Sequence, residues 1–280
     1  MRRSPVLTTS KKSLWLSGPY LIWIAGFTVL PILTIVVYAF TSAEHKFTLD
    51  NILNAVTDSV NIKAFFVTMA FALSATVICL LITYPLAICL SKLKMKRKNF
   101  LIFLFILPMW MNFMLQMVAI NVLLEDNGVF NTVLSWLGFE KLHIVNTPAA
   151  VLIGMVYDYL PFMLLPMYNT VSKIDRSLIE ASRDLGAGPV QTFFKVLFPL
   201  SLPGVVSGIT MVFIPALSDF AIAEMLGGGK ILLIGNIVEM SFTKGHYYQG
   251  SGLALILMAF VLITSLLPGG SDSEGGAVLL

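Results

Sequence analysis

The chain has 280 residues, of which 57% are hydrophobic and 12% are charged, and its formal net charge is +3. Soluble globular domains carry about 25% charged residues. This composition, with a mean hydropathy of +0.87, excludes a soluble domain and predicts an integral membrane protein. Cys79 and Cys89 lie on one apolar run, about 15 Å apart along a helix, so they are not expected to form a disulfide with each other.

Six apolar stretches are long enough to cross a bilayer as helices, which takes about 20 residues. They cover residues 16–41, 63–90, 100–123, 148–171, 203–226 and 250–268. The first is too long for a signal-peptide core and lacks a small-x-small cleavage site, so it is expected to be a retained helix. Interior prolines predict kinks in several stretches, at Pro31, Pro85, Pro108, Pro161, Pro166 and Pro215.

Lysine and arginine are concentrated on alternate connections. Thirteen of the 18 lie in the N-terminus, in the loop after the second stretch and in the central loop, against five on the other connections. Because cytoplasmic loops carry the excess of basic residues, both termini and the central loop are predicted to be cytoplasmic. The predicted organisation is a cytoplasmic N-terminus (1–15), a single transmembrane domain (16–268) whose central loop covers 172–203, and a disordered acidic tail (269–280).

The other connections are predicted to lie outside the cell. The polar segment 42–62 contains a helix start at Asp50 and Asn51, and the segment 129–142 is patterned as a short amphipathic helix on the outer surface. The third stretch groups Trp110 with Asn112, Phe113 and Gln116 shortly before that outer segment.

The apolar stretches also contain acidic residues, which at membrane depth are functional candidates. Asp158 lies in the fourth stretch beside Tyr157, with no lysine or arginine in that stretch, and Asp219 and Glu224 lie toward the outer end of the fifth. Carboxylates and aromatic faces attract a cation such as a polyamine. The predicted substrate path comprises Tyr157, Asp158, Trp110, Asp219 and Glu224.

Structural roles are the alternative for these acids. Asp158 could instead bond a neighbouring tyrosine or a backbone group, and Asp219 and Glu224 could simply reach the outer interface. In the fifth stretch, Gly204 and Gly208 have the four-residue spacing that permits close helix packing.

The central loop is patterned as two short helices. Apolar residues recur at helical spacing in its first half, at Ile174, Leu178, Ala181 and Leu185. Asp175 is the predicted N-cap, and Gly186 is predicted to end the helix. Ser177 and Glu180 have the spacing of a capping box.

The second helix of the central loop is predicted to begin at Pro189, because proline suits the first helical position. Its apolar surface consists of Phe193, Phe194, Val196 and Leu197. Pro199 is predicted to end it. The pair of helices is expected to dock onto a partner.

The run Glu180-Ala181-Ser182-Arg183-Asp184-Leu185-Gly186, followed by Pro199 and Leu202-Pro203, resembles the EAA loop of binding-protein-dependent ABC importer permeases. Ser182 stands where that family usually has alanine. The resemblance implies an all-α fold of the type I ABC importer permease, with six transmembrane helices and a coupling helix that sits in a groove of an ATPase subunit. The coupling residues that it implies are Glu180, Ala181, Ser182, Asp184, Leu185, Gly186, Ala187 and Pro199.

Two further segments, 160–168 and 226–236, are similar to spermidine/putrescine permeases of the PotB type. This resemblance implies polyamine import by alternating access across the bacterial inner membrane. It also implies a pair of ATP-binding subunits that hold ATP and magnesium, a second homologous permease and an extracytoplasmic solute-binding protein. No cofactor is expected in this chain.

Other functions receive less support from the sequence. Gly229-Lys230 is followed by Ile231 instead of serine or threonine, so it fails as a nucleotide-binding loop. The same permease scaffold could carry thiamine, iron or an opine-like cation. An intramembrane aspartyl protease would also pair two aspartates, but here Pro215-Ala216-Leu217 precedes Asp219 where that family's motif follows the second aspartate.

Metal and nucleic-acid binding are not expected either. The three histidines, His45, His143 and His246, lie in separate outer segments. The basic run 92–98 is interpreted as the contact with anionic lipid headgroups at the inner membrane surface.

Overall fold

A computed structural model describes residues 18–20 and 22–266, so the predicted N-terminus and the acidic tail lie outside the described residues. The described chain is helical apart from an isolated bridge between Thr41 and Phe47. The α-helices are α2 (Leu30–Ala39), α3 (Asp50–Thr57), α4 (Ser59–Lys92), α5 (Met95–Ile106), α6 (Phe113–Leu124), α7 (Val129–Trp136), α8 (Pro148–Val171), α9 (Arg176–Asp184), α10 (Pro189–Thr192), α11 (Phe198–Ser218), α12 (Ala221–Leu226), α13 (Ile234–Thr243) and α14 (Tyr247–Ser265).

Six segments of the described chain are long and apolar enough to span a membrane, which confirms the predicted number. They are Gly18–Ala39, Ser59–Lys92, Phe113–Trp136, Pro148–Val171, Pro189–Ser218 and Tyr247–Ser265. The largest differences from the predicted boundaries occur in the third and fifth spans.

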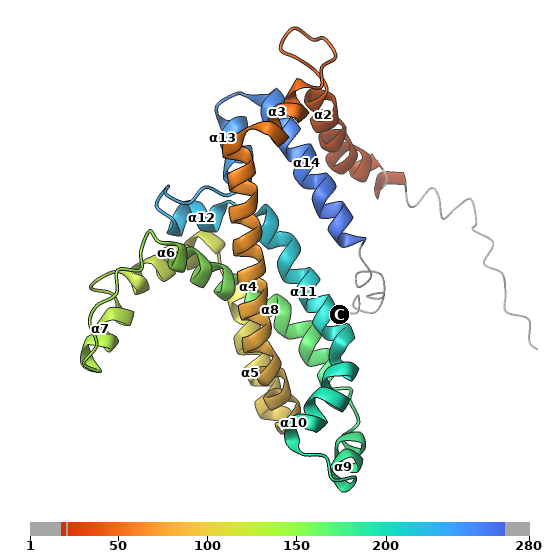
Figure 1. Ribbon diagram of the computed structural model, residues 1–280, viewed down its shortest axis with the longest axis vertical. Coiled ribbons are helices and arrows are strands. Elements are labelled where there is room, and N and C mark those ends of the chain that lie inside the picture. The colour runs from red at the N-terminus through yellow and green to blue at the C-terminus, as the bar shows by residue number, and fades with distance from the viewer. Residues whose placement is uncertain (1–17, 21, 267–280) are drawn as a thin grey trace, which may run out of the picture.

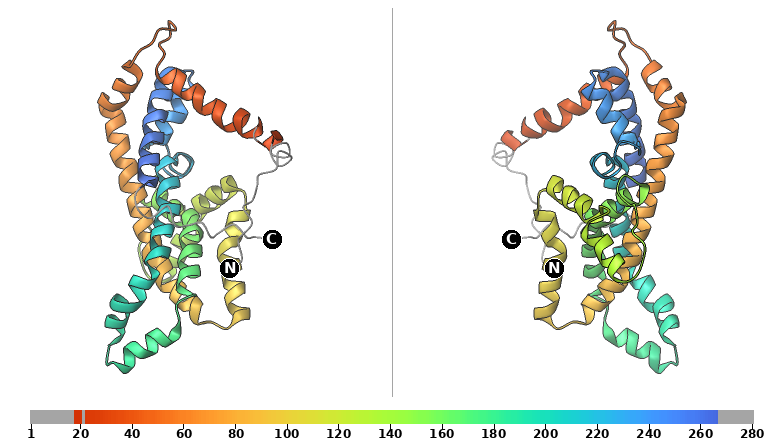
Figure 2. Two further views of the ribbon diagram at one scale, coloured as in Figure 1. Left: turned by 90° about the vertical axis from the view of Figure 1, so that its right-hand side faces the viewer. Right: turned by 90° about the vertical axis from the view of Figure 1, so that its left-hand side faces the viewer.

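The predicted third stretch, 100–123, consists of α5 and α6 with a break beside Pro108, where the sequence predicts a kink. The third apolar segment of the structure, Phe113–Trp136, instead joins α6 and α7, so the predicted boundaries of this span are wrong. α5 gives way to a 3₁₀ turn, η2 (Leu107–Trp110), and α6 begins after Asn112. The Asn112 side chain accepts a hydrogen bond from the Leu115 N–H (3.2 Å), which makes Asn112 an N-cap. The Gln116 amide donates to the Pro108 carbonyl. These side-chain bonds replace backbone bonds of a continuous helix, and α5 and α6 meet at an angle (Figure 2).

In the fifth span, the prediction that a second short helix ends at Pro199 is wrong. The chain passes from α10 through a π-helical turn, η3 (Phe193–Leu197), directly into α11. This wider turn directly precedes Pro199, whose ring nitrogen cannot donate a backbone hydrogen bond. Single π-turns occur inside α-helices, and a helix bends at such turns and at prolines.

The fifth span also ends earlier than predicted, at Ser218 instead of residue 226. The Asp219 carboxylate accepts a hydrogen bond from the Ile222 N–H (3.2 Å), which favours a new helix start. Residues 221–226 therefore form the separate helix α12.

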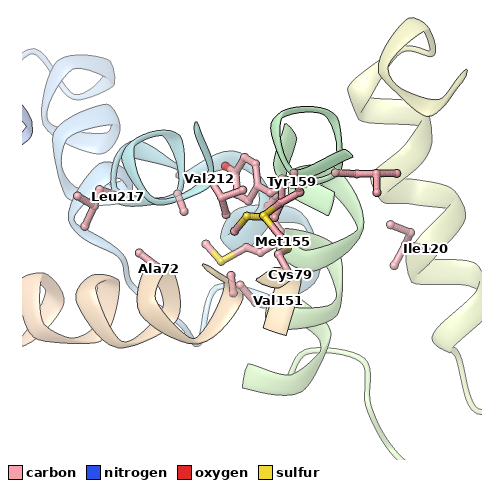
Figure 3. Packing of buried hydrophobic residues seen from close by; sticks show 14 of the residues in the cluster. Ala72, Cys79, Ile120, Val151, Met155, Tyr159, Val212 and Leu217 are labelled. Atoms are coloured by element: carbon pink, nitrogen blue, oxygen red, sulfur yellow. The ribbon is translucent and has the colours of Figure 1, made fainter. Parts of the chain in front are cut away.

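The core is built around α8, which packs between α4 and α11. Val151 and Met155 of α8 are fully buried there, together with Cys79 of α4 and Val212 of α11 (Figure 3). Close packing of α11 on α8 at the predicted glycines is confirmed. A Cβ on Gly204 would lie 2.6 Å from Thr170 Oγ1 and 3.0 Å from the Pro166 carbonyl oxygen.

Replacing Gly204 by valine is expected to destabilise the bundle by about 1–3 kcal/mol, because the backbone carbonyl of Pro166 cannot move aside as a side chain can. The thermal unfolding midpoint of the detergent-solubilised chain measures this effect. Gly26→Val is the matched control, since a Cβ at Gly26 has no neighbour within 4 Å among the described atoms. Equal midpoints for the two variants would contradict the tight α8–α11 contact.

α2 is set apart from this core. It packs chiefly against α14 and leans away from the other spans (Figures 1 and 2). Within α2, all of which is described, only Ala39 is buried. Its apolar surface therefore lacks a protein neighbour over most of its length in this single chain.

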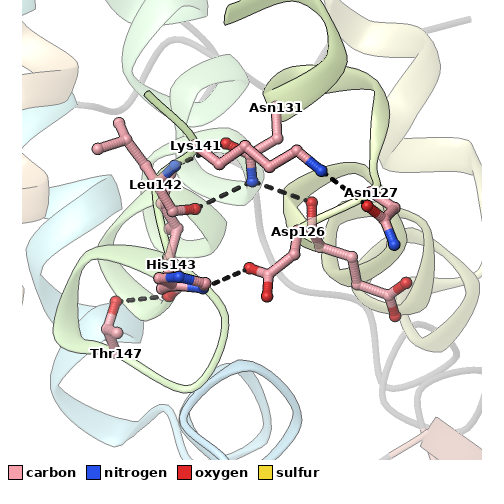
Figure 4. A network of polar contacts seen from close by, with 9 residues as sticks. Asp126, Asn127, Asn131, Lys141, Leu142, His143 and Thr147 are labelled. Carbon is pink, nitrogen blue, oxygen red and sulfur yellow. Dashed lines mark hydrogen bonds and ion pairs between the residues drawn. The ribbon is translucent and has the colours of Figure 1, made fainter. Parts of the chain in front are cut away.

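The predicted outer helix 129–142 is shorter than expected, because α7 ends at Trp136. Gly138 has φ +84°, and the Phe139 N–H donates to the Leu134 carbonyl (3.0 Å). Such a left-handed residue ends a helix. The buried Asn131 side chain then ties the hairpin together by donating to the carbonyls of Glu125 (3.1 Å) and Leu142 (3.0 Å) (Figure 4).

Substituting Asn131 with alanine is expected to loosen this hairpin by about 1–3 kcal/mol, since it removes three hydrogen bonds between the buried side chain and the backbone of Glu125 and Leu142. Hydrogen–deuterium exchange of amides 125–143 is expected to accelerate roughly tenfold or more. Asn127→Ala serves as the control because its bond to Lys141 (2.8 Å) is exposed. The same exchange in both variants would show that Asn131 does not hold the hairpin.

Candidate functional site

The central loop forms an exposed helix, α9, at one end of the molecule. α9 lies at the opposite end from α3 and α13 (Figure 1). None of its residues is buried, and Leu185, which follows it, is 89% exposed. An amphipathic helix with unpartnered leucines is a surface that a partner protein can cover.

The local sequence explains where α9 begins. The prediction of Asp175 as N-cap is confirmed, because its carboxylate accepts a hydrogen bond from the Ser177 N–H (3.0 Å). This bond lowers the pKa of Asp175, so the cap is present at neutral pH and weakens as the pH falls through that pKa. The predicted capping box of Ser177 and Glu180 is wrong, since the N-cap is Asp175 and Ser177 already lies in the first turn.

The end of α9 is fixed by Gly186, as predicted. Gly186 has φ +83°. The Gly186 N–H donates to the Arg183 carbonyl (2.8 Å), and the Ala187 N–H donates to the Ser182 carbonyl (3.1 Å). This pair of bonds is the Schellman arrangement, which needs a left-handed residue at the position of Gly186.

A hollow of about 690 Å³ lies between α9 and the segment that leads into α11. This segment, α10 and η3 (189–197), is called the arm below. Six of the eight predicted coupling residues line it: Ala181, Ser182, Leu185, Gly186, Ala187 and Pro199. The Ser182 hydroxyl of α9 and the Thr192 hydroxyl of α10 lie 3.1 Å apart. Of the other two, Glu180 lies on a different face of α9, and Asp184 is exposed.

Basic residues gather at this same end of the bundle. Arg176 of α9 donates from Nη2 to the carbonyl of Ser91, near the end of α4 (3.3 Å). Lys98 of α5 places its ammonium 5.4 Å from the ring centre of Tyr168, near the end of α8. The loop after the second span and the central loop, both rich in lysine and arginine, are therefore neighbours in space.

A second candidate site lies in the apolar part of the bundle, where α8 meets two interruptions of the chain. Asp158 lines a cavity of about 150 Å³ together with Pro108 of η2 and Gln116 of α6. Asp219, at the break between α11 and α12, accepts a hydrogen bond from the Tyr159 hydroxyl (3.2 Å). Tyr159, the neighbour of Asp158 in the sequence, thereby holds Asp219 against α8.

The two acids differ in their bonding. Both Asp219 oxygens are occupied, by the Tyr159 hydroxyl and by the Ile222 N–H. Among the hydrogen bonds and ion pairs of residues 22–266, none involves the half-buried Asp158 carboxylate. The Asp219 carboxylate is therefore held by two hydrogen bonds, while no such bond to the Asp158 carboxylate is found in residues 22–266.

The remaining predicted path residues do not line the cavity beside Asp158. Trp110 is 81% exposed and stacks edge-on against Phe103. Tyr157 is 40% exposed, and Glu224 is exposed on α12. The structure instead places Tyr159 against Asp219. The Tyr157-Asp158-Tyr159 triplet is the sequence signal that could have indicated this residue. The rotation of α8 between α4 and α11 decides which tyrosine faces inward.

The described residues contain no group of three or more His, Cys, Asp or Glu side chains that could hold a metal ion. The two candidate sites are the exposed, capped helix α9 at the basic end and the acids Asp158 and Asp219 at the spans.

Residues 83–267 match the family described as binding-protein-dependent transport system inner membrane component, and the chain belongs to this family. It is a transport subunit and a multi-pass inner-membrane protein. The chain is 38% identical over 253 residues to the spermidine/putrescine transport system permease protein PotB of Escherichia coli (strain K12), covering 88% of this chain and 92% of that protein. It is 42% identical over 194 residues to the PotB of Haemophilus influenzae, covering 67% and 68% of the two chains.

The fold matches solved transporters as well. A bacterial alginate ABC transporter, crystallised with an alginate pentasaccharide-bound periplasmic protein, superimposes with a TM-score of 0.73 at 17% identity, covering 92% of this chain and 96% of that one. The predicted type I ABC importer permease fold is therefore confirmed.

Proposed function

We propose that this chain imports polyamines such as spermidine and putrescine by alternating access, driven by a separate ATPase subunit through α9. The observation that carries the proposal is the exposed, doubly capped helix α9 beside its hollow. The spermidine/putrescine names of relatives that match 88% of the chain at 38% identity support the substrate.

In this proposal the ATPase covers α9 and fills the hollow. Leu185 supplies apolar contact area, while Glu180 and Asp184 are exposed carboxylates that can pair with basic residues of the partner. α9 is joined to α8 on one side and, through η3, to α11 on the other. Because α8 and α11 pack together in the core, a displacement of α9 moves the spans that carry Asp158 and Asp219. ATP and magnesium belong to the ATPase, and this chain holds no cofactor.

Asp158 is the proposed cation-binding residue of the substrate path. Its carboxylate faces a cavity of about 150 Å³, which suits an ammonium end of a polyamine with the rest of the molecule extended along the path. The attraction between opposite charges rises as water is excluded, and it offsets the cost of removing both charges from water. A permease for another small cation is the alternative, because the same acid would attract it.

A second homologous permease is proposed to complete the path. α2 exposes most of its apolar surface and contacts chiefly α14, so a neighbouring permease can pack against it. The proposed orientation places both termini and the basic end with α9 in the cytoplasm. The opposite end, with α3 and α13, then faces an extracytoplasmic solute-binding protein (Figure 1).

Uptake into vesicles tests the proposal. The chain would be reconstituted with its second permease and ATPase, ATP would be enclosed, and labelled spermidine would be supplied outside on the solute-binding protein. ATP-dependent accumulation is expected, with competition by putrescine. If spermidine did not accumulate but labelled thiamine or a labelled ferric ligand did so with ATP, the substrate would be replaced while the transport mechanism was kept.

A further inference from the structure

A second cavity, of about 440 Å³, lies on the face of α9 that points away from the hollow. The residues of α9 that line it, Arg176, Ile179, Glu180 and Arg183, recur every three or four positions, so they share one face of the helix. The residues that line the hollow, such as Ala181 and Leu185, lie on the opposite face. The cavity is closed by the ends of α4 and α8 and by the arm.

The charged side chains around this cavity have a surplus of positive charge. Lys92, Arg176 and Arg183 line it, against Glu180 as the one acid. The ion pairs of the described residues are Lys46–Glu44 and His143–Asp126, so neither Lys92 nor Arg183 has a carboxylate partner there. Unpaired guanidinium and ammonium groups around a concave site favour an anion, and arginine binds phosphate through paired N–H donors.

The rest of the lining is apolar and belongs to membrane spans. Ile88 of α4 and Val171 of α8 contribute apolar walls beside the charged rim. Both residues lie within the last turns of helices long enough to cross a bilayer. The cavity therefore combines a cationic rim with apolar side chains at the ends of two spans. Lys94 and Arg97, which follow α4 in the chain, are exposed.

We propose that this cavity binds an anionic phospholipid, whose headgroup phosphate contacts Arg176, Arg183 and Lys92 while its acyl chains lie along α4 and α8. A free phosphate would use the same cations but gain nothing from the apolar wall. A bound lipid would also join α9 to the end of α4, which Arg176 already contacts through the Ser91 carbonyl. The site is a property of this chain alone and does not depend on which solute is transported.

Lipid binding to the full-length chain in neutral detergent tests the proposal, for example by native mass spectrometry with phosphatidylglycerol, phosphatidylcholine or inorganic phosphate. Phosphatidylglycerol is expected to bind roughly tenfold or more tightly than phosphatidylcholine, since only its headgroup brings a net negative charge to the three cations that line the cavity. The double substitution Arg176→Gln/Arg183→Gln should abolish this preference. Lys92→Gln, which alters no hydrogen bond of the described residues, should reduce it severalfold.

The matched control removes two charges from the same end of the bundle outside the cavity, as Lys94→Gln/Arg97→Gln. It should keep most of the preference for the anionic lipid. An equal loss in the control and in the cavity variant would show general surface attraction and overturn the site. Equally effective competition by inorganic phosphate would overturn the lipid in favour of a free anion, and equal binding of both lipids would overturn the proposal altogether.

Discussion

Replacing Gly186 by valine is expected to abolish coupling between ATP hydrolysis and transport while the chain still inserts into the membrane. Gly186 has φ +83°, a conformation that costs a residue with a Cβ about 1–2 kcal/mol and a β-branched residue more. The variant would lose the two backbone bonds that end α9, and the position of Leu185 beside the hollow would change. Substrate-stimulated ATPase activity of the assembled complex is expected to fall at least tenfold.

Gly188→Val is the control that isolates backbone conformation. A Cβ has no described neighbour within 4 Å at either glycine, but Gly188 has φ −69° and ψ 167°, which valine adopts readily. This variant should retain most of the stimulation. Glu180→Lys provides a second variant, which reverses a charge on α9 without changing its ends. Normal uptake by both Gly186→Val and Glu180→Lys would contradict the assignment of α9 as the coupling helix.

Substituting Asp158 with asparagine is expected to reduce uptake of a cationic substrate by roughly ten- to hundredfold. The estimate follows from the loss of one charge-assisted contact, about 1.5–3 kcal/mol. The change preserves the shape of the side chain and removes no hydrogen bond seen among the described residues, so the thermal unfolding midpoint should stay the same. Initial rates of spermidine uptake at several concentrations measure the effect.

Two other acids serve as comparisons. Glu224→Gln, on the exposed side of α12, is expected to transport normally. Asp219→Asn is expected to lower stability as well as uptake, because its carboxylate accepts bonds from Tyr159 and Ile222. If Asp158→Asn transported polyamines at the normal rate, its carboxylate would have no part in the substrate path.

The parts of the fold that follow from local chemistry could be predicted from the sequence. Six apolar runs specify six spans, and the start and stop of α9 follow from an aspartate and a glycine that act on their own neighbouring backbone. The kink near Pro108 was predicted, but the new helix start at Asn112 was not, because an asparagine within an apolar run gives no sign that its side chain will cap a helix. The continuation of the helix past Pro199 was not predicted, because the π-turn before this proline depends on how residues 189–197 pack.

For the candidate sites, the sequence indicates residue types but not their orientation. The hydrogen bond between Tyr159 and Asp219 joins segments 60 residues apart in the chain through the packing of α8 and α11. Trp110 lies in the 3₁₀ turn and is 81% exposed in this single chain. Which side of a span faces inward is decided by neighbouring helices, and apolar residues surround every side of these spans alike.

The run from Pro189 to Ser218 has a mechanical consequence. Its 30 residues stay helical from the segment beside α9 to the residue next to Asp219, through η3 and past Pro203 and Pro215. Prolines and π-turns are the places where a helix bends. A displacement of α9 therefore changes the tilt of α11 at the bend before Pro199 and leaves the helix continuous.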